Sequence, residues 1–205
     1  MKRILILFSI LVGILLVGGM VFLFAEPGDR LGNPTATSYP SKLTSEKQVY
    51  DGDTLKDVRI QILDMGSGLK IPRTRRELWP GVFLTPKATI EVETDVRLSG
   101  IDTPEKRPLR KKRDGSLRSE KSRSNEKYAA AQSRLALLRL LKDNALEFTV
   151  SNPTIGKYAG RIVAGVKVDG VDAAQFLIEN GNALPYDGGR KVELDWENLS
   201  DGVMR

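Results

Sequence analysis

The chain has 205 residues, 40% of them hydrophobic, so it can bury the core of one ordinary domain and still carry an appendage. It has no cysteine and no histidine, which excludes disulfides, thiolate or imidazole metal sites, and catalysis by a cysteine nucleophile or a histidine base. The formal net charge of +6 favours polyanionic partners such as nucleic acid or anionic lipid. Any catalysis must therefore use carboxylates, hydroxyls, lysine or arginine, with or without a hard metal ion.

Residues 1–25 are predicted to form a transmembrane signal anchor. The uncharged run from residue 4 to residue 25 would span about 33 Å as a helix, enough to cross a bilayer. A cleaved signal peptide has a shorter apolar stretch of about 7–15 residues, so a retained anchor is preferred, with cleavage and secretion as the alternative. Because Lys2 and Arg3 precede the run, the rest of the chain is expected outside the cytoplasm, in the periplasm or extracellular space.

The segment 26–45 is rich in Pro, Gly, Ser and Thr without periodicity and is predicted to be a flexible tether. The folded domain is expected over 46–205. Alternating apolar residues predict strands around 58–62, 88–98, 146–150 and 161–168, whereas 64–69 is expected to form a turn and the stretch from there to residue 86 to be irregular.

Two helices are predicted in this domain, over 124–141 and 171–180. The first is indicated by apolar residues that recur at three- and four-residue steps, namely Tyr128, Ala131, Leu135, Leu138 and Leu141. Gly181 is a natural stop for the second helix. Short strands with two to three helices indicate an α+β domain built on a small β-barrel.

Three segments carry residues suited to chemistry: Asp51-Gly52-Asp53-Thr54 at the start of a strand, Arg97 followed by Asp102-Thr103-Pro104-Glu105 at a strand end, and Gly160-Arg161 at the start of another strand. Taken singly, each has a structural explanation. Asp-Gly is a common hairpin turn, proline ends a strand, and an arginine is often only a surface residue.

Together, these segments resemble the staphylococcal (micrococcal) nuclease family, whose pattern is Asp-Gly-Asp-Thr, then Arg followed five residues later by Asp-Thr-Pro-Glu, then Gly-Arg after the first helix. The resemblance covers roughly residues 48–196, and the segment 181–190 also resembles bacterial members. It implies an OB-fold, a five-stranded β-barrel with packed helices, in a monomeric domain for which no protein partner is expected.

The resemblance also implies a calcium-dependent endonuclease that cleaves DNA, with RNA as an open second substrate, and leaves 3′-phosphate ends. Asp53 and Asp102 would supply carboxylate oxygens to Ca²⁺, the backbone carbonyl of Thr103 would be a further ligand, and Asp51 would act through water. Calcium prefers hard oxygen ligands of this kind, and none of them requires histidine.

For the reaction itself, the resemblance implies that Glu105 accepts a proton from the attacking water or orients it. Arg97 and Arg161 would hold the phosphate and its growing negative charge. Planar guanidinium groups suit this role because they bind phosphate oxygens in bidentate fashion.

The chain departs from the family pattern in places. The usual Tyr-Gly-Arg is interrupted by Ala159, which argues against Tyr158 occupying the family's terminal-phosphate position. Lys157 and Tyr158 are still taken as candidates for contact with the substrate, and Tyr186 is a second candidate for stacking or phosphate contact, with core packing as its alternative. The segment 66–87 is an insertion with no assigned role.

A strongly basic segment follows Glu105. Residues 106–123 hold nine basic and two acidic side chains, a net charge of +7. Lys111, Lys112 and Arg113 at its centre are predicted to contact nucleic acid, and binding to anionic lipid is the alternative.

Two rival functions remain. One is a catalytically silent OB-fold module that binds nucleic acid at the membrane. The other is a membrane-tethered adaptor that uses the basic segment for lipid or protein contact. Neither explains why all five candidate site residues are present, namely Asp53, Arg97, Asp102, Glu105 and Arg161.

Overall fold

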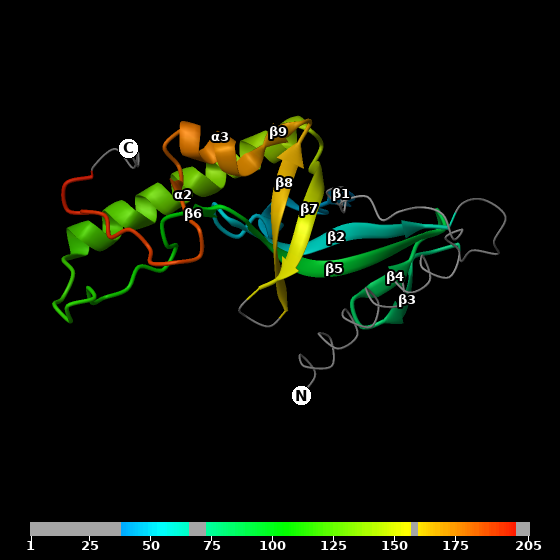
Figure 1. Cartoon of the computed structure of the whole chain (residues 1–205), viewed down its shortest axis with the longest axis horizontal. Coiled ribbons are helices and arrows are strands. Elements are labelled where there is room, and N and C mark those ends of the chain that lie inside the picture. Colours follow the sequence, from blue (N-terminus) through cyan, green and yellow to red (C-terminus); the bar gives the residue numbers. More distant parts are fainter. Residues whose placement is uncertain (1–37, 66–72, 157–159, 200–205) are drawn as a thin grey trace, which may run out of the picture.

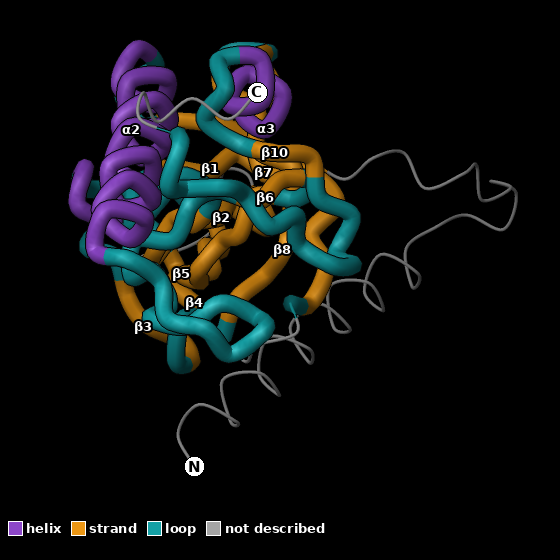
Figure 2. The backbone as a smooth tube through the Cα atoms, turned by 90° about the vertical axis from the view of Figure 1, so that its left-hand side faces the viewer, coloured by secondary structure: helices purple, strands orange, loops and turns teal. Residues whose placement is uncertain are grey.

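The computed structural model describes residues 38–65, 73–156 and 160–199, and five of its strands close into a barrel (Figures 1 and 2). Antiparallel pairs join β2 to β5, β1 to β2, β1 to β7 and β7 to β8, and a parallel pair of β5 with β8 closes the ring. The barrel strands are β1 (Ser38–Lys42), β2 (Thr54–Asp64), β5 (Thr89–Leu98), β7 (Glu147–Ile155) and β8 (Arg161–Val168).

The core lies inside this ring and follows from the alternation of the strands. Leu55 and Val58 of β2, Val96 of β5, Val150 of β7 and Val166 of β8 are at most 1% exposed. β-branched side chains fit such a pleated, buried surface, which is why these stretches form strands.

The remaining elements decorate the barrel. They are a 3₁₀-helix η1 (Glu46–Gln48), the hairpin β3 (Arg76–Trp79) and β4 (Val82–Leu84), the short strands β6 (Ile101–Asp102), β9 (Val171–Asp172) and β10 (Leu184–Pro185), and the helices α2 (Glu120–Asp143) and α3 (Ala173–Glu179). The two α-helices lie on the same side of the barrel (Figure 2), and β10 pairs with β6.

The predicted α+β class with a five-stranded barrel and two helices is confirmed for the described residues, and the closure is consistent with an OB-fold. Strand β8 has the predicted bounds. Residues 38–42, expected in the tether, instead form β1, because this polar stretch finds backbone partners on both sides. Residues 76–84, expected to be irregular, form the β3–β4 hairpin turning at Pro80-Gly81, where Gly81 has a φ of 77°.

Helix α2 begins four residues earlier than predicted, because Ser119 caps it by accepting a hydrogen bond from the Ser122 N–H at 2.9 Å. Only part of the apolar stripe that indicated this helix is buried. Leu138 and Leu141 are buried, but Tyr128, Ala131 and Leu135 are exposed. Small residues form the contact instead, since they let the helix approach the barrel closely; they include Ala129, Ala130 and Ser133.

The predicted anchor over residues 1–25 lies outside the described residues. Within the described part of the chain, no helix is both long and apolar enough to cross a membrane.

Candidate functional site

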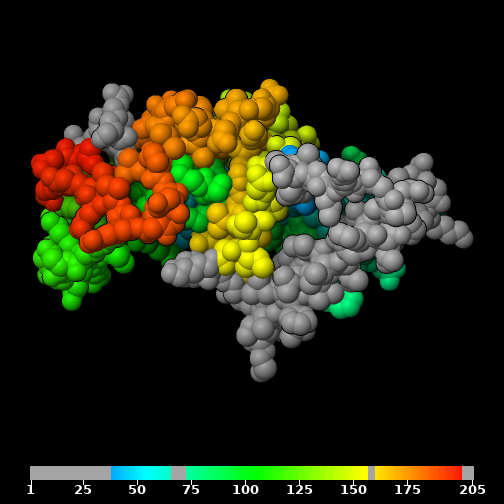
Figure 3. Space-filling model, viewed as in Figure 1, coloured from blue at the N-terminus to red at the C-terminus, as the bar shows by residue number. Residues whose placement is uncertain are grey.

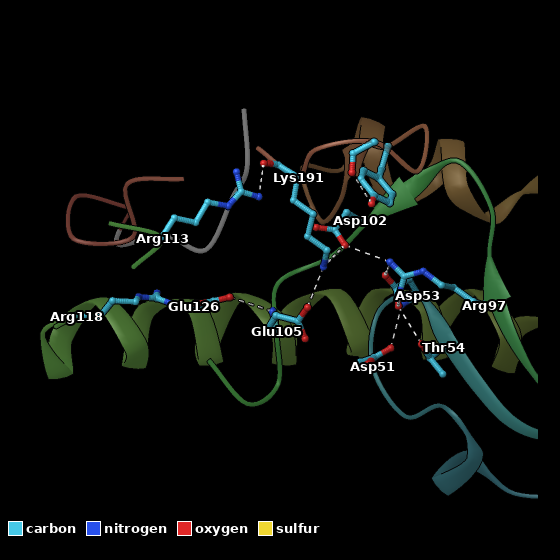
Figure 4. A network of polar contacts seen from close by, with 12 residues as sticks. Asp51, Asp53, Thr54, Arg97, Asp102, Glu105, Arg113, Arg118, Glu126 and Lys191 are labelled. Atoms are coloured by element: carbon cyan, nitrogen blue, oxygen red, sulfur yellow. Dashed lines mark hydrogen bonds and ion pairs between the residues drawn. The ribbon is translucent and has the colours of Figure 1, made fainter. Parts of the chain in front are cut away.

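Arg97 joins the two acidic turns that the sequence singles out (Figure 4). It lies on β5 opposite Thr54, the first residue of β2, so its side chain reaches the turn that precedes β2. Its Nη1 donates to Asp53 Oδ1 at 2.9 Å and its Nη2 lies 2.8 Å from Asp53 Oδ2, while Nη2 also donates to Asp102 Oδ1 at 3.1 Å. One guanidinium therefore fixes carboxylates that are 49 positions apart in the sequence.

Close backbone packing brings these turns together. The Leu98 N–H donates to the Asp53 carbonyl at 2.8 Å. A Cβ atom on Gly52 would lie 2.6 Å from Cβ of Ser133 and 2.9 Å from Cγ2 of Thr103, so only glycine allows helix α2 and the second acidic turn to approach this closely. The β6–β10 pair then holds Asp102 opposite Leu184.

Asp53 is the most deeply buried of the candidate carboxylates, with 3% of the residue exposed. Burial is the main cause that raises its pKa from 3.8 to about 7; Arg97 acts against this shift, whereas the charges of Asp51 and Asp102 act with it. Asp51 lies close by, since its Oδ1 accepts a hydrogen bond from the Asp53 N–H at 3.3 Å. Burial, more than neighbouring charge, therefore disfavours the ionised form of Asp53.

Lys191 is a member of the site that no sequence pattern indicated. Its Nζ lies 2.7 Å from Asp102 Oδ1 and 2.9 Å from Glu105 Oε1. Partial burial lowers the pKa of Lys191, but the hydrogen bonds to Asp102 and Glu105 outweigh it and raise the pKa above its ordinary value. An ammonium ion therefore stands between the expected metal ligand and the expected base.

All of these residues except Asp102 line a cavity of about 930 Å³, and Thr103, Arg161 and Tyr186 line it as well. Arg161 reaches it from the start of β8, where it pairs with Asp95 on β5, two positions before Arg97. The Tyr186 hydroxyl donates to the Gly189 carbonyl at 3.0 Å within the same loop. Asp53, Arg97, Glu105, Arg161 and Tyr186 are thus brought to one cavity.

The basic residues predicted to contact nucleic acid do not line this cavity. Lys111, Lys112 and Arg113 lie in the loop before α2 and line a neighbouring groove of about 750 Å³. This groove shares Thr103, Pro104, Glu105 and Lys191 with the first cavity. Lys157 and Tyr158 lie outside the described residues.

The loop and the C-terminal segment are linked across this groove. Arg113 Nη2 donates to the Lys191 carbonyl at 3.3 Å, and Asn125 of α2 donates to the Trp196 carbonyl at 2.8 Å. In Figure 3 the C-terminal segment, in red and orange, lies against the loop and helix coloured green. The segment that carries Lys191 is therefore held against the helix that follows the basic loop.

The donor chemistry suits a hard cation, although among residues 38–65, 73–156 and 160–199 no set of three or more acidic side chains is grouped closely enough to hold a metal ion alone. The Asp53 and Asp102 carboxylates share one Arg97 nitrogen and therefore lie side by side. Because burial and neighbouring negative charge both disfavour ionised Asp53, an added cation would be electrostatically favoured.

Comparison of the sequence with models of known protein families gives no match, and a search of curated proteins also finds no significant match.

Proposed function

We propose that this domain is a calcium-dependent endonuclease of the staphylococcal nuclease type, with an OB-fold barrel, acting on DNA and with RNA as an open second substrate. The observation that carries the proposal is the convergence of Arg97, Arg161 and Glu105 with two acidic turns around one cavity. Chance placement explains this poorly, because the residues come from three separate parts of the chain.

Two arginines from neighbouring strands suit a phosphodiester. Arg97 and Arg161 would hold the non-bridging phosphate oxygens, where negative charge grows during attack. A guanidinium has five N–H donors, so Arg97 can keep its bonds to the two aspartates and still donate to a phosphate.

Glu105 is the group placed to take a proton. Its side chain is 56% exposed, so a water molecule can reach it. Carboxylates act as general bases where no imidazole is available. Calcium, when bound by Asp53, Asp102 and the Thr103 carbonyl, would supply additional positive charge for the phosphate.

A second candidate function is a silent module that only binds nucleic acid. It is favoured by Lys191, because a cation of the chain itself already neutralises Asp102 and Glu105. In that case the barrel would bind DNA with no dependence on calcium and without cleavage.

Digestion of plasmid DNA by the full chain in detergent distinguishes the two. The nuclease is expected to cut with calcium, poorly with magnesium because magnesium demands tighter octahedral geometry, and not with excess chelator. Binding without cleavage under all three conditions would support the silent module, and full activity in chelator would reject the metal assignment.

We propose that residues 1–25 anchor the domain outside the cytoplasm, on the charge asymmetry of the N-terminal sequence. Alkaline phosphatase fused after residue 45 is expected to be active in a bacterial host, and a reporter that works only in the cytoplasm is expected to be inactive there. The reverse pair of results would overturn this orientation, and a mature chain that begins near Glu26 would show a cleaved signal.

A further inference from the structure

Glu126 is a buried acid that the proposed reaction does not use. It lies near the start of α2, and only 6% of the residue is exposed. A buried carboxylate is unfavourable by several kcal/mol unless other groups compensate its charge. Its neighbours on the same helix face, Ala129, Ala130 and Ser133, are small and buried. An apolar residue at position 126 could therefore extend this packing contact.

The partners of Glu126 come from the two ends of one loop (Figure 4). Its Oε1 accepts a hydrogen bond from the Glu105 N–H at 3.2 Å. Its Oε2 lies 2.6 Å from Arg118 Nη1, and the Arg118 side chain is itself only 11% exposed. Glu105 immediately precedes the basic loop, residues 106–117, and Arg118 immediately follows it. The Glu126 carboxylate therefore contacts both ends of this loop.

Arg118 is tied to the helix as well. Its Nη2 donates to the Ser122 hydroxyl at 3.1 Å and its Nε donates to the same oxygen at 3.3 Å. The end of the loop is therefore anchored at two points of the first turns of α2. The basic side chains Lys111 and Lys112 lie between the anchored ends and remain exposed.

Glu105 needs such an anchor. Its side chain is 56% exposed and receives little packing, and the described contact of its carboxylate is the Lys191 ammonium. The position of the carboxylate relative to Asp102 therefore depends on the backbone at residue 105. A displacement of about 1 Å at a reacting group can lower a rate by roughly 10²-fold.

The geometry points to Glu126 as a positioning residue for the proposed reaction: through the Glu105 N–H it sets where the general base stands, and through Arg118 it fixes the basic loop beside that base. This inference rests on the proposed function for the role of Glu105. The contacts themselves do not, so the two can fail separately.

Two variants divide the roles of Glu126. Glu126→Gln keeps an oxygen that can accept the Glu105 N–H but removes the charge that pairs with Arg118. Glu126→Met removes both interactions while keeping a side chain of similar length. The matched control is Glu120→Gln, an exposed acid in the first turn of the same helix.

For the full chain with calcium, Glu126→Met is expected to lower kcat by about 10-fold or more and, because it also loses the ion pair with Arg118, to raise KM. Glu126→Gln is expected to restore most of kcat but to raise KM through the loosened loop, and Glu120→Gln is expected to match the wild type. A purely structural role would lower the melting temperature of both Glu126 variants and leave kcat of the folded protein unchanged, which would refute the inference.

Hydrogen exchange in the metal-free protein provides a readout that does not depend on nuclease activity. Peptides covering residues 103–107 are expected to exchange faster in Glu126→Met and to be largely protected again in Glu126→Gln. Unchanged exchange in Glu126→Met would overturn the inference even if the protein proves to be a nuclease. Faster exchange in a protein that never cleaves DNA would confirm the anchor and reject only the proposed function.

Discussion

Lys191 places an ammonium ion between Asp102 and Glu105, where the proposed reaction needs a metal ligand and a free base. A cation fixed by the chain competes with a cation from solution for the same oxygens. The segment that carries Lys191 also receives a hydrogen bond from Arg113 of the basic loop. Calcium binding and the position of the C-terminal segment are therefore expected to be linked.

Replacing this ammonium is expected to strengthen calcium binding. Lys191→Met keeps the aliphatic stem but removes the positive charge, so the calcium Kd should fall by about 5–10-fold, which corresponds to roughly 1 kcal/mol. Isothermal titration of the metal-free protein measures it directly. Lys142→Met is the control, because Lys142 forms an exposed ion pair with Glu46. Weaker calcium binding in Lys191→Met would contradict the competition.

Asp53 gives the metal-free protein a characteristic pH dependence. Its pKa is about 7 when folded against an ordinary value of 3.8, because of burial. Between these values the folded state keeps a proton that the unfolded state has released, so rising pH favours unfolding. The free energy of unfolding is expected to fall between about pH 4 and pH 7, by up to roughly 4 kcal/mol from this group.

Denaturant unfolding at several pH values, in chelator, measures this slope. Asp53→Asn cannot ionise and is expected to remove most of the decrease. If the variant and the wild type lost stability in parallel over this range, the titrating group would be a different one.

At the scale of elements, a strand could be predicted from the sequence where its apolar and polar residues alternate regularly. Strand β8 has the bounds that its alternation indicates. Strand β1 has the sequence Ser-Tyr-Pro-Ser-Lys, which lacks alternating apolar residues, and it becomes a strand only because β2 and β7 offer it partners. The β3–β4 hairpin escaped prediction for a related reason, since all four residues of β3 are exposed.

The site was predictable where short motifs carried it. Asp53, Arg97, Glu105 and Arg161, which come from three separate segments, line one cavity, and Asp102 is joined to Arg97. Lys191 and Glu126 could not be predicted, because their partners are 86 and 21 positions away and only the folded chain brings them together. On α2, the apolar stripe of Tyr128, Ala131 and Leu135 indicated the helix but not its buried face, which includes the small residues Ala129, Ala130 and Ser133.

The exposed lysines of the basic loop are expected to contribute to DNA binding. Lys111 and Lys112 are exposed and have no described contact with the acidic turns, whereas Arg113 holds the Lys191 carbonyl. Neutralising Lys111 and Lys112 together is expected to weaken DNA binding and to reduce the salt dependence of log affinity by about one unit per lost phosphate contact, with turnover at saturating DNA nearly unchanged.

Fluorescence titration with a labelled duplex at several salt concentrations gives this slope. Replacing Arg113 as well is expected to affect turnover too, because it releases the segment that carries Lys191. If the Lys111/Lys112 variant binds DNA with unaltered salt dependence, the loop does not contact nucleic acid. If the same variant instead binds anionic vesicles more weakly than the wild type, the lipid alternative is supported.

For the whole molecule, the barrel acts as a rigid frame for groups that are far apart in sequence. Strands β5 and β8 lie side by side and bring Arg97 and Arg161 to one end of the ring, while α2 packs under both the Gly52 turn and the Glu105 turn. The basic loop and C-terminal segment extend from that end as a second groove. A strand of nucleic acid held across both would place its phosphate beside Glu105.

The most direct test of a nuclease centred on Glu105 is single-turnover cleavage of a defined DNA duplex in calcium by wild type, Glu105→Gln and the Lys111/Lys112 pair variant. Glu105→Gln keeps the size and hydrogen bonding of the side chain but cannot take the proton, so its rate is expected to fall by about 10²-fold or more at unchanged DNA affinity. The pair variant should keep the wild-type rate at saturation. Wild-type turnover in Glu105→Gln, with turnover abolished in the pair variant, would show that cleavage occurs elsewhere.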